Sequence, residues 1–101
     1  MPCSYVLLEG AQAELDSILS YLCKLTGGTK AARDFADEFE RQIAIACENP
    51  EIHALSRIPE LARLGYRAML VKNYVVLYAY RNEVILVTHV FHQRQDYAKL
   101  V

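Results

Sequence analysis

The spacing of apolar residues along the chain predicts one strand followed by two helices. Residues 5–8 are apolar and stand before Glu9-Gly10, as at the end of a short strand. From about Ala11 the spacing becomes helical, and Gly27-Gly28 ends this first helix because glycine is favoured in helix-ending turns. Thr29 is then the expected N-cap of a second helix, which Asn49-Pro50 closes. The apolar faces of the two helices comprise Leu15, Ile18, Leu19 and Leu22, and Ala32, Phe35, Ala36, Phe39, Ile43 and Ala46.

The last third of the chain has the composition of β-structure. Residues 66–71, 74–80 and 84–91 are rich in Val, Tyr, Leu and Ile, and the short polar segments between them suit tight hairpins. Residues 51–64 contain Pro59 and predict a loop with a short helical turn. The order β-α-α-β-β-β predicts a single α+β domain over residues 1–101, with a helical hairpin packed on one face of a mainly antiparallel sheet.

Composition agrees with one packed domain and adds an asymmetry of charge. The chain has 101 residues, of which 53% are hydrophobic and 23% charged, and its formal net charge is −1. Residues 1–56 hold 4 Lys/Arg against 9 Asp/Glu (−5), whereas residues 57–101 hold 7 against 3 (+4). An acidic helical half therefore precedes a basic half rich in strands. This asymmetry raises the question of what the basic half binds.

Several classes of protein are disfavoured by the sequence. No apolar run approaches the roughly 20 residues of a membrane-spanning helix, and the N-terminus lacks the basic region of a signal peptide. The three cysteines, at positions 3, 23 and 47, form no C-x-x-C pair, which argues against a disulfide framework and a zinc site. Phosphate-binding loops are also missing. We therefore expect a cytoplasmic protein with reduced thiols, no metal, no cofactor and no membrane association.

Arg67 is a candidate functional residue because it opens an apolar strand. Strand alternation places it on the same face as Met69 and Val71, opposite Ala68 and Leu70. An unpaired guanidinium is costly to bury, so we expect Arg67 at a sheet edge or facing an open groove. The alternative is a surface arginine that aids solubility or pairs with a nearby carboxylate.

The densest polar cluster, residues 92–97, directly follows the last predicted strand. It holds an imidazole (His92), a guanidinium (Arg94), a carboxylate (Asp96) and a phenol (Tyr97). In a functional interpretation, His92 transfers protons while Arg94 and Tyr97 contact a phosphate. In a structural interpretation, which composition alone favours, Asp96 pairs with Arg94 and Tyr97 packs on the sheet. His89 lies within the strand pattern, where a packed or hydrogen-bonded role is expected.

Tyrosines are concentrated in the basic half, where aromatic rings among cations can stack on nucleic-acid bases. Tyrosine is also a good strand residue, and core packing is the simpler role for most of them. Tyr66 and Tyr97 are kept as candidate contacts.

A set of short motifs runs through the predicted strands. They are Gly65-Tyr66-Arg67, Val71-Lys72-Asn73-Tyr74, Val76-Leu77-Tyr78, and Val84-Ile85 followed by His92-Gln93-Arg94-Gln95-Asp96-Tyr97. Together with the N-terminal strand, the helical hairpin and Asn49-Pro50, they resemble the RelE/ParE family of bacterial toxins. The resemblance implies the toxin of a type II toxin–antitoxin module, associated with plasmid stabilisation, which inhibits growth until a cognate antitoxin covers its basic surface.

The resemblance leaves two mechanisms open. RelE-like members cut messenger RNA on the ribosome, and for such an activity it implies His92 as base or acid, Arg67 and Arg94 as clamps and Tyr97 as a helper. ParE-like members inhibit DNA gyrase without being nucleases. Nucleases of the family usually carry an arginine where this chain has Val75, so a ParE-like or uncharacterised target is favoured and enzymatic activity stays undecided.

The residues expected to contact the target are Arg63, Arg67, Lys72, Arg81 and Arg94. The partners that the resemblance implies are an antitoxin and either the ribosome with its mRNA or DNA gyrase. The expected assembly is a homodimer or a toxin–antitoxin hetero-oligomer.

Overall fold

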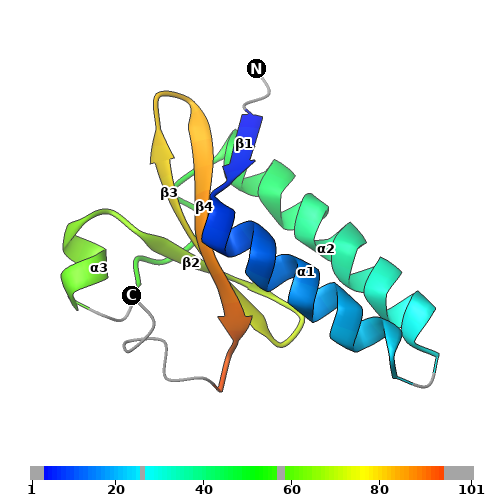
Figure 1. The fold of residues 1–101 in the computed structure, drawn as a ribbon. Helices are drawn as coiled ribbons and strands as arrows, with labels where there is room; N and C mark the ends of the chain where they lie inside the picture. Colours follow the sequence, from blue (N-terminus) through cyan, green and yellow to red (C-terminus); the bar gives the residue numbers. More distant parts are fainter. Residues whose placement is uncertain (1–3, 26, 57–58, 95–101) are drawn as a thin grey trace.

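A four-stranded sheet with helices on both sides makes up the fold (Figure 1). The computed structural model describes residues 4–25, 27–56 and 59–94. The elements in chain order are β1 (Ser4–Leu7), α1 (Glu9–Cys23), α2 (Gly28–Glu48), α3 (Pro59–Arg63), β2 (Arg67–Val71), β3 (Tyr74–Arg81) and β4 (Val84–His92). The strands lie in the order β1-β4-β3-β2, with β1 parallel to β4 and the other neighbours antiparallel. The predicted fold class and the mainly antiparallel sheet are confirmed.

The main core lies between the sheet and the hairpin of α1 and α2, which run side by side across one face (Figure 1). Phe35, Phe39 and Ile43 of α2 are buried there against alternate residues of the strands, including Val76 and Tyr78. Alternation sends the intervening strand residues to the other face, where α3 covers part of the sheet. The smaller cluster on that side is built from Leu61, Leu77 and Phe91, packed with Tyr66, Ala68 and Val75.

The junction between α1 and α2 differs from the sequence prediction. The second helix begins at Gly28, and its N-cap is Gly27, whose φ of 71° is left-handed. Thr29 lies inside the first turn, so its predicted capping role is wrong. The physical reason is close approach, because a Cβ on Gly28 would overlap the carbonyl oxygen of Leu22 in α1. The turn needs a glycine pair, and this requirement decides where the helix starts.

A bulge in β4 changes which residues face the helices. Leu77 pairs with His89 while the next residue, Tyr78, pairs with Val87, so Thr88 has no opposite residue in β3. Its hydroxyl instead donates to the Leu77 carbonyl at 3.3 Å. As a result, Val90 joins the helix-side core together with Val87. In a strictly alternating strand, Val87 and Val90 would lie on opposite faces, because they are three positions apart.

The cysteines correct one expectation from the sequence. Cys47 forms a disulfide, whereas Cys23 is free and exposed. The expectation that all thiols are reduced is therefore wrong at Cys47. Among residues 4–25, 27–56 and 59–94, no helix is long and apolar enough to cross a membrane.

Candidate functional site

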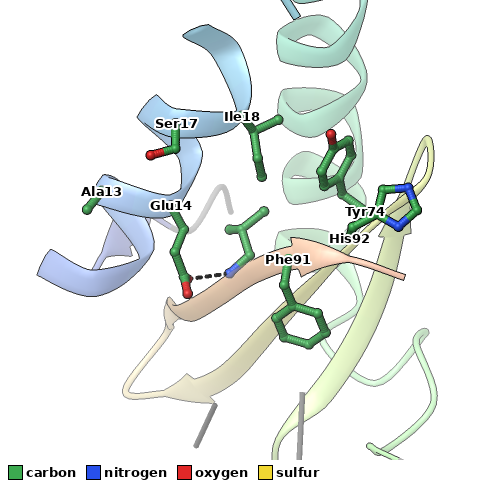
Figure 2. A pocket seen from close by; sticks show the side chains of 8 residues that line it. Ala13, Glu14, Ser17, Ile18, Tyr74, Phe91 and His92 are labelled. Carbon is green, nitrogen blue, oxygen red and sulfur yellow. Dashed lines mark hydrogen bonds between the residues drawn. The ribbon is translucent and has the colours of Figure 1, made fainter. Parts of the chain in front are cut away.

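The predicted catalytic imidazole lies at a pocket of about 340 Å³ between α1 and the last residues of β4 (Figure 2). The His92 ring meets the Tyr74 ring edge-on, with centroids 5.2 Å apart and planes at 80°. Its Nδ1 accepts the backbone N–H of Arg94 at 3.1 Å. Because an accepting nitrogen carries no proton, this geometry fits the neutral ring. His92 thus holds the chain as it leaves β4, and Nδ1 is already engaged.

Glu14 of α1 lies at the other end of this pocket and was missed by sequence reasoning. Its Oε1 accepts the backbone N–H of Val90 at 2.8 Å, and its Oε2 lies 3.4 Å from Nδ1 of His89. Pairing with β1 covers β4 only as far as Val87, so the carboxylate takes the place of a strand partner beyond that point. The hydrogen-bonded role expected for His89 is confirmed. A lone glutamate on an amphipathic helix carries no sequence signal for such a contact.

Arg67 does not reach His92. Its strand is at the sheet edge, as predicted, and its Nη1 donates to the His53 carbonyl at 2.7 Å. Arg67 pairs with Tyr78 and His92 pairs with Tyr74, four residues away on the same strand. At 3.4 Å per residue, the two positions lie about 14 Å apart along β3, and on opposite sides of it.

The remaining predicted cations form two groups at opposite ends of the sheet. Arg63 is exposed in the last turn of α3, near Arg81, whose guanidinium donates to the Leu64 carbonyl at 2.7 Å and to the Tyr80 carbonyl at 3.0 Å. Arg81 therefore ties α3 to β3.

Lys72 and Arg94 are exposed at the other end, beyond the eight residues of β3 or about 24 Å away. Lys72 lies in the turn before β3, close to the acidic side of α2. The pKa of Glu38 is lowered to about 2, chiefly by a hydrogen bond from Arg41, then by one from Gln42 and to a smaller extent by the charge of Lys72. The basic half thus offers no continuous patch among these four residues.

Val75 and Ala68 meet in a second hollow, of about 420 Å³, on the α3 side of the sheet. Val75 is the position where the family resemblance implies an arginine in the nucleases. The described residues that line the hollow carry no charge, and they are Ala54, Leu55, Ala68, Met69, Leu70, Val75 and Gln93. Gln93 holds the nearby turn, since its Nε2 lies 3.4 Å from the Asn73 Oδ1. This hollow can accept apolar groups, and it offers no acid, base or cation for phosphate chemistry.

Tyr97 lies outside the described residues, as does Asp96. Within the described part of the chain, no group of three His, Cys, Asp or Glu side chains could hold a metal ion.

Solved structures from toxin–antitoxin systems share this fold. Among solved structures, the chromosomal ParDE toxin–antitoxin system from P. aeruginosa is similar, with a TM-score of 0.67 and 19% identity over 89% of this chain and 95% of that one. The toxin–antitoxin complex RelBE2 from Mycobacterium tuberculosis is similar with a TM-score of 0.60 and 18% identity, over 91% of this chain and 99% of that one. The search of curated proteins found no match. The structural similarities establish a RelE/ParE-like fold.

The family follows from a match along most of the sequence. The family model described as the ParE toxin of the type II toxin–antitoxin system parDE matches residues 5–97. The chain therefore belongs to the ParE toxin family, and it is the toxin of a type II toxin–antitoxin system. The recognition made from the strand motifs is confirmed.

Proposed function

We propose that this toxin stops growth by binding DNA gyrase, and that it does not cleave RNA. The observation that carries the proposal is the uncharged hollow around Val75, Ala68 and Leu70. A nuclease of this family needs charge at this place, because a phosphate in the transition state must be held by cations. A hollow lined by small and apolar side chains is suited to contact with a protein surface.

The arrangement of the other candidates supports the same proposal. Attack of a 2′-hydroxyl on its own phosphate needs a base, an acid and a clamp within reach of one group. Arg67 is about 14 Å from His92 along the sheet and is already bonded to the His53 carbonyl. His92 in turn binds the backbone of Arg94 through Nδ1. This separation of Arg67 from His92 supports a binding role over a shared catalytic one.

We further propose that a cognate antitoxin neutralises this toxin. The family supports this partner, and the similar structures come from a ParDE system and a RelBE2 toxin–antitoxin complex. Arg63, Arg81 and the exposed Leu64 together form a surface where cations flank an apolar group. We expect an acidic and apolar segment there, on gyrase or on the antitoxin. Both proposed interactions place the working protein in the cytoplasm.

Two assays run side by side test this function. Expression of the chain in bacteria should stop growth, and the purified protein should inhibit supercoiling by gyrase while leaving mRNA on translating ribosomes intact. Arg63→Ala should weaken gyrase inhibition by about tenfold if it removes a charged contact. Lys30→Ala, which removes an exposed cation of α2 away from this surface, should change inhibition by less than about twofold.

Opposite results would overturn the proposal. Cleaved mRNA with unaffected supercoiling would identify a ribosome-dependent nuclease, and a loss of cleavage in His92→Asn would then assign the base. Normal growth at good soluble expression would contradict the toxin's proposed action on either target.

A further inference from the structure

We propose that the pocket between α1 and β4 binds an arginine side chain of a partner protein. We call it the arginine pocket and define it by Glu14, Ser17, Tyr74 and His92. It lies on the helix side of the sheet, whereas the uncharged hollow lies on the α3 side. In Figure 2 Glu14 reaches down from α1 to β4, Tyr74 and His92 stand side by side at the far end, and Phe91 points away across β4. The inference is independent of gyrase as the target.

Glu14 supplies the charge that an arginine would meet. Its side chain is 31% exposed, although Oε1 accepts the Val90 N–H and Oε2 contacts His89 at 3.4 Å. A carboxylate has about four acceptor positions, so these two contacts leave room for a guanidinium. Among the described residues that line the pocket, none is a lysine or an arginine. A cation entering the pocket therefore meets a carboxylate and no lining cation.

The far wall of the pocket is aromatic. The Tyr74 ring is fixed on both sides, edge-on to Phe35 at 5.3 Å and edge-on to His92 at 5.2 Å. A cation over an aromatic face is attracted by the electrons of the ring, and a planar guanidinium also stacks on it. The His92 ring is itself held in place, since its Nδ1 accepts the backbone N–H of Arg94. A carboxylate opposite preformed rings is the pattern that favours arginine over a neutral side chain.

The outer face of α1 indicates that the arginine belongs to a protein. A second hollow, of about 380 Å³, adjoins the pocket through Ser17 and reaches Tyr21, which is 56% exposed. Asp16 and Lys24 also line it, so this hollow carries one charge of each sign, and its exposed tyrosine ring is the part that an apolar side chain would contact. Glu14 and Tyr21 are seven residues apart, so they lie about 10 Å apart along the helix. A peptide segment with an arginine and an apolar side chain at this separation matches both hollows at once, whereas a small cation would fill one.

The test uses arginine itself in a blocked form. N-acetyl-arginine amide is titrated into the isotope-labelled full chain, and the amide signals of residues in and around the pocket are followed by NMR. We expect saturable shifts at Val90 and His92 with a dissociation constant on the order of millimolar, as a ligand of this size allows. N-acetyl-citrulline amide has nearly the same shape without the charge and should give at most weak, non-saturating shifts.

Variants separate the pocket from general effects. Glu14→Gln keeps an oxygen for the Val90 N–H but removes the charge, and it should weaken binding by about fivefold or more. Glu9→Gln, in the first turn of the same helix and outside the pocket, should leave binding unchanged. His92→Asn removes the ring while keeping an acceptor, and it should also weaken binding. Equal shifts with citrulline, or equal binding by Glu14→Gln and the parent, would overturn the proposal.

Discussion

Tyr78 shows how one polar atom in the core holds a loop. Its side chain is fully buried, and its hydroxyl donates to the Pro50 carbonyl at 3.0 Å, across 28 positions in sequence. Burial raises the pKa of Tyr78 to about 12, with the nearby charge of Arg67 acting weakly in the opposite direction. The same segment after α2 is held a second time by Arg67 at the His53 carbonyl. Tyr78, which the sequence suggested for the core, and Arg67, which it suggested for target contact, thus both hold the segment after α2.

Tyr78→Phe should lower the free energy of unfolding at neutral pH by about 1 kcal/mol, because it deletes one hydrogen bond without leaving a cavity. Its pH dependence gives a second measurement. The folded-state pKa is raised, so the associated stability is complete below pH 10 and is lost as the pH rises from 10 toward 12. Urea unfolding across this range should show a smaller alkaline loss for the variant than for the parent. The exposed Tyr80→Phe is the control, and an equal change in both variants would contradict the assignment.

His53 is a second residue with an unusual environment. Its Nε2 is buried with no hydrogen-bond partner among the residues that the structure describes, and its ring lies edge-on to Tyr78 with centroids 6.0 Å apart. Burial lowers the pKa of His53 below its usual 6.5. Protonation therefore favours the unfolded chain, and the associated stability is present above pH 6.5 and is lost as the pH falls below it.

His53→Phe should keep the ring contact and remove the buried nitrogen. We expect a gain of about 1 kcal/mol in the free energy of unfolding near neutral pH, since an unsatisfied polar group is replaced by an apolar one. The variant should also lose less stability between pH 6.5 and pH 5 than the parent, as measured by denaturant unfolding. His89→Phe would be a poor control because that ring contacts Glu14. If His53→Phe lost more stability than the parent between pH 6.5 and pH 5, protonation of His53 would not be the cause of the acid loss.

At the scale of elements, Gly28 at the start of α2 has no space for a side chain, whereas Gly10 in α1 does. A Cβ on Gly28 would overlap the Leu22 carbonyl oxygen and lie 2.8 Å from the Cys23 carbonyl oxygen, both of which belong to backbone. A Cβ on Gly10, within α1, would meet nothing within 4 Å. The helical hairpin therefore depends on glycine at its turn and not at its start.

Gly28→Ala should destabilise the protein by about 3 kcal/mol, because the two helices must separate or the turn must deform. Gly10→Ala should stabilise it by roughly 0.5 kcal/mol, since alanine costs less entropy in a helix. Thermal unfolding followed by circular dichroism measures both. If the two substitutions had effects of the same sign, steric conflict at the turn would be the wrong explanation.

The elements themselves were largely predictable, and the reasons lie in local pattern. The stripe of Phe35, Phe39 and Ile43 has helical spacing, and each of them is buried in the core. Asn82 and Glu83 form the last hairpin turn with φ of 50° and 63°, although the sequence placed Arg81 in that turn as well. The bulge at Thr88 and the start of α2 were not predictable, because the first depends on the register between β3 and β4 and the second on the close approach of Gly28 to the end of α1.

At the scale of the whole molecule, the basic half of the sequence is divided by the fold. Arg63 and Arg81 lie at one end of the sheet, while Lys72 and Arg94 lie at the other. Since charges separated by more than about 8 Å are largely screened at physiological salt, the two groups act separately. The acidic half also contributes to the fold, because Glu14 of α1 accepts a hydrogen bond from the backbone of β4.

Arg63→Ala and Arg81→Ala should differ in their effect on the free energy of unfolding, although both remove one charge from the same end of the sheet. Arg81→Ala removes the hydrogen bonds to the Leu64 and Tyr80 carbonyls and should lower the free energy of unfolding by about 1 kcal/mol. Arg63→Ala should change it by less than about 0.5 kcal/mol, as is usual for an exposed residue. Urea unfolding distinguishes them, and any loss of toxicity in Arg63→Ala can then be assigned to the surface. A large destabilisation by Arg63→Ala would contradict this assignment.

The sequence by itself determined the class of fold, the family and the apolar faces, because these depend on local periodicity and on short motifs. It also gave a sheet edge as one of two places for Arg67 and a packed or hydrogen-bonded role for His89. Only the tertiary structure decided which side chains meet: Arg67 with the His53 carbonyl, Glu14 with β4, and Val75 with Ala68 in one uncharged hollow. The physical reason is that periodicity fixes the face on which a residue lies, whereas strand order and register fix its neighbours.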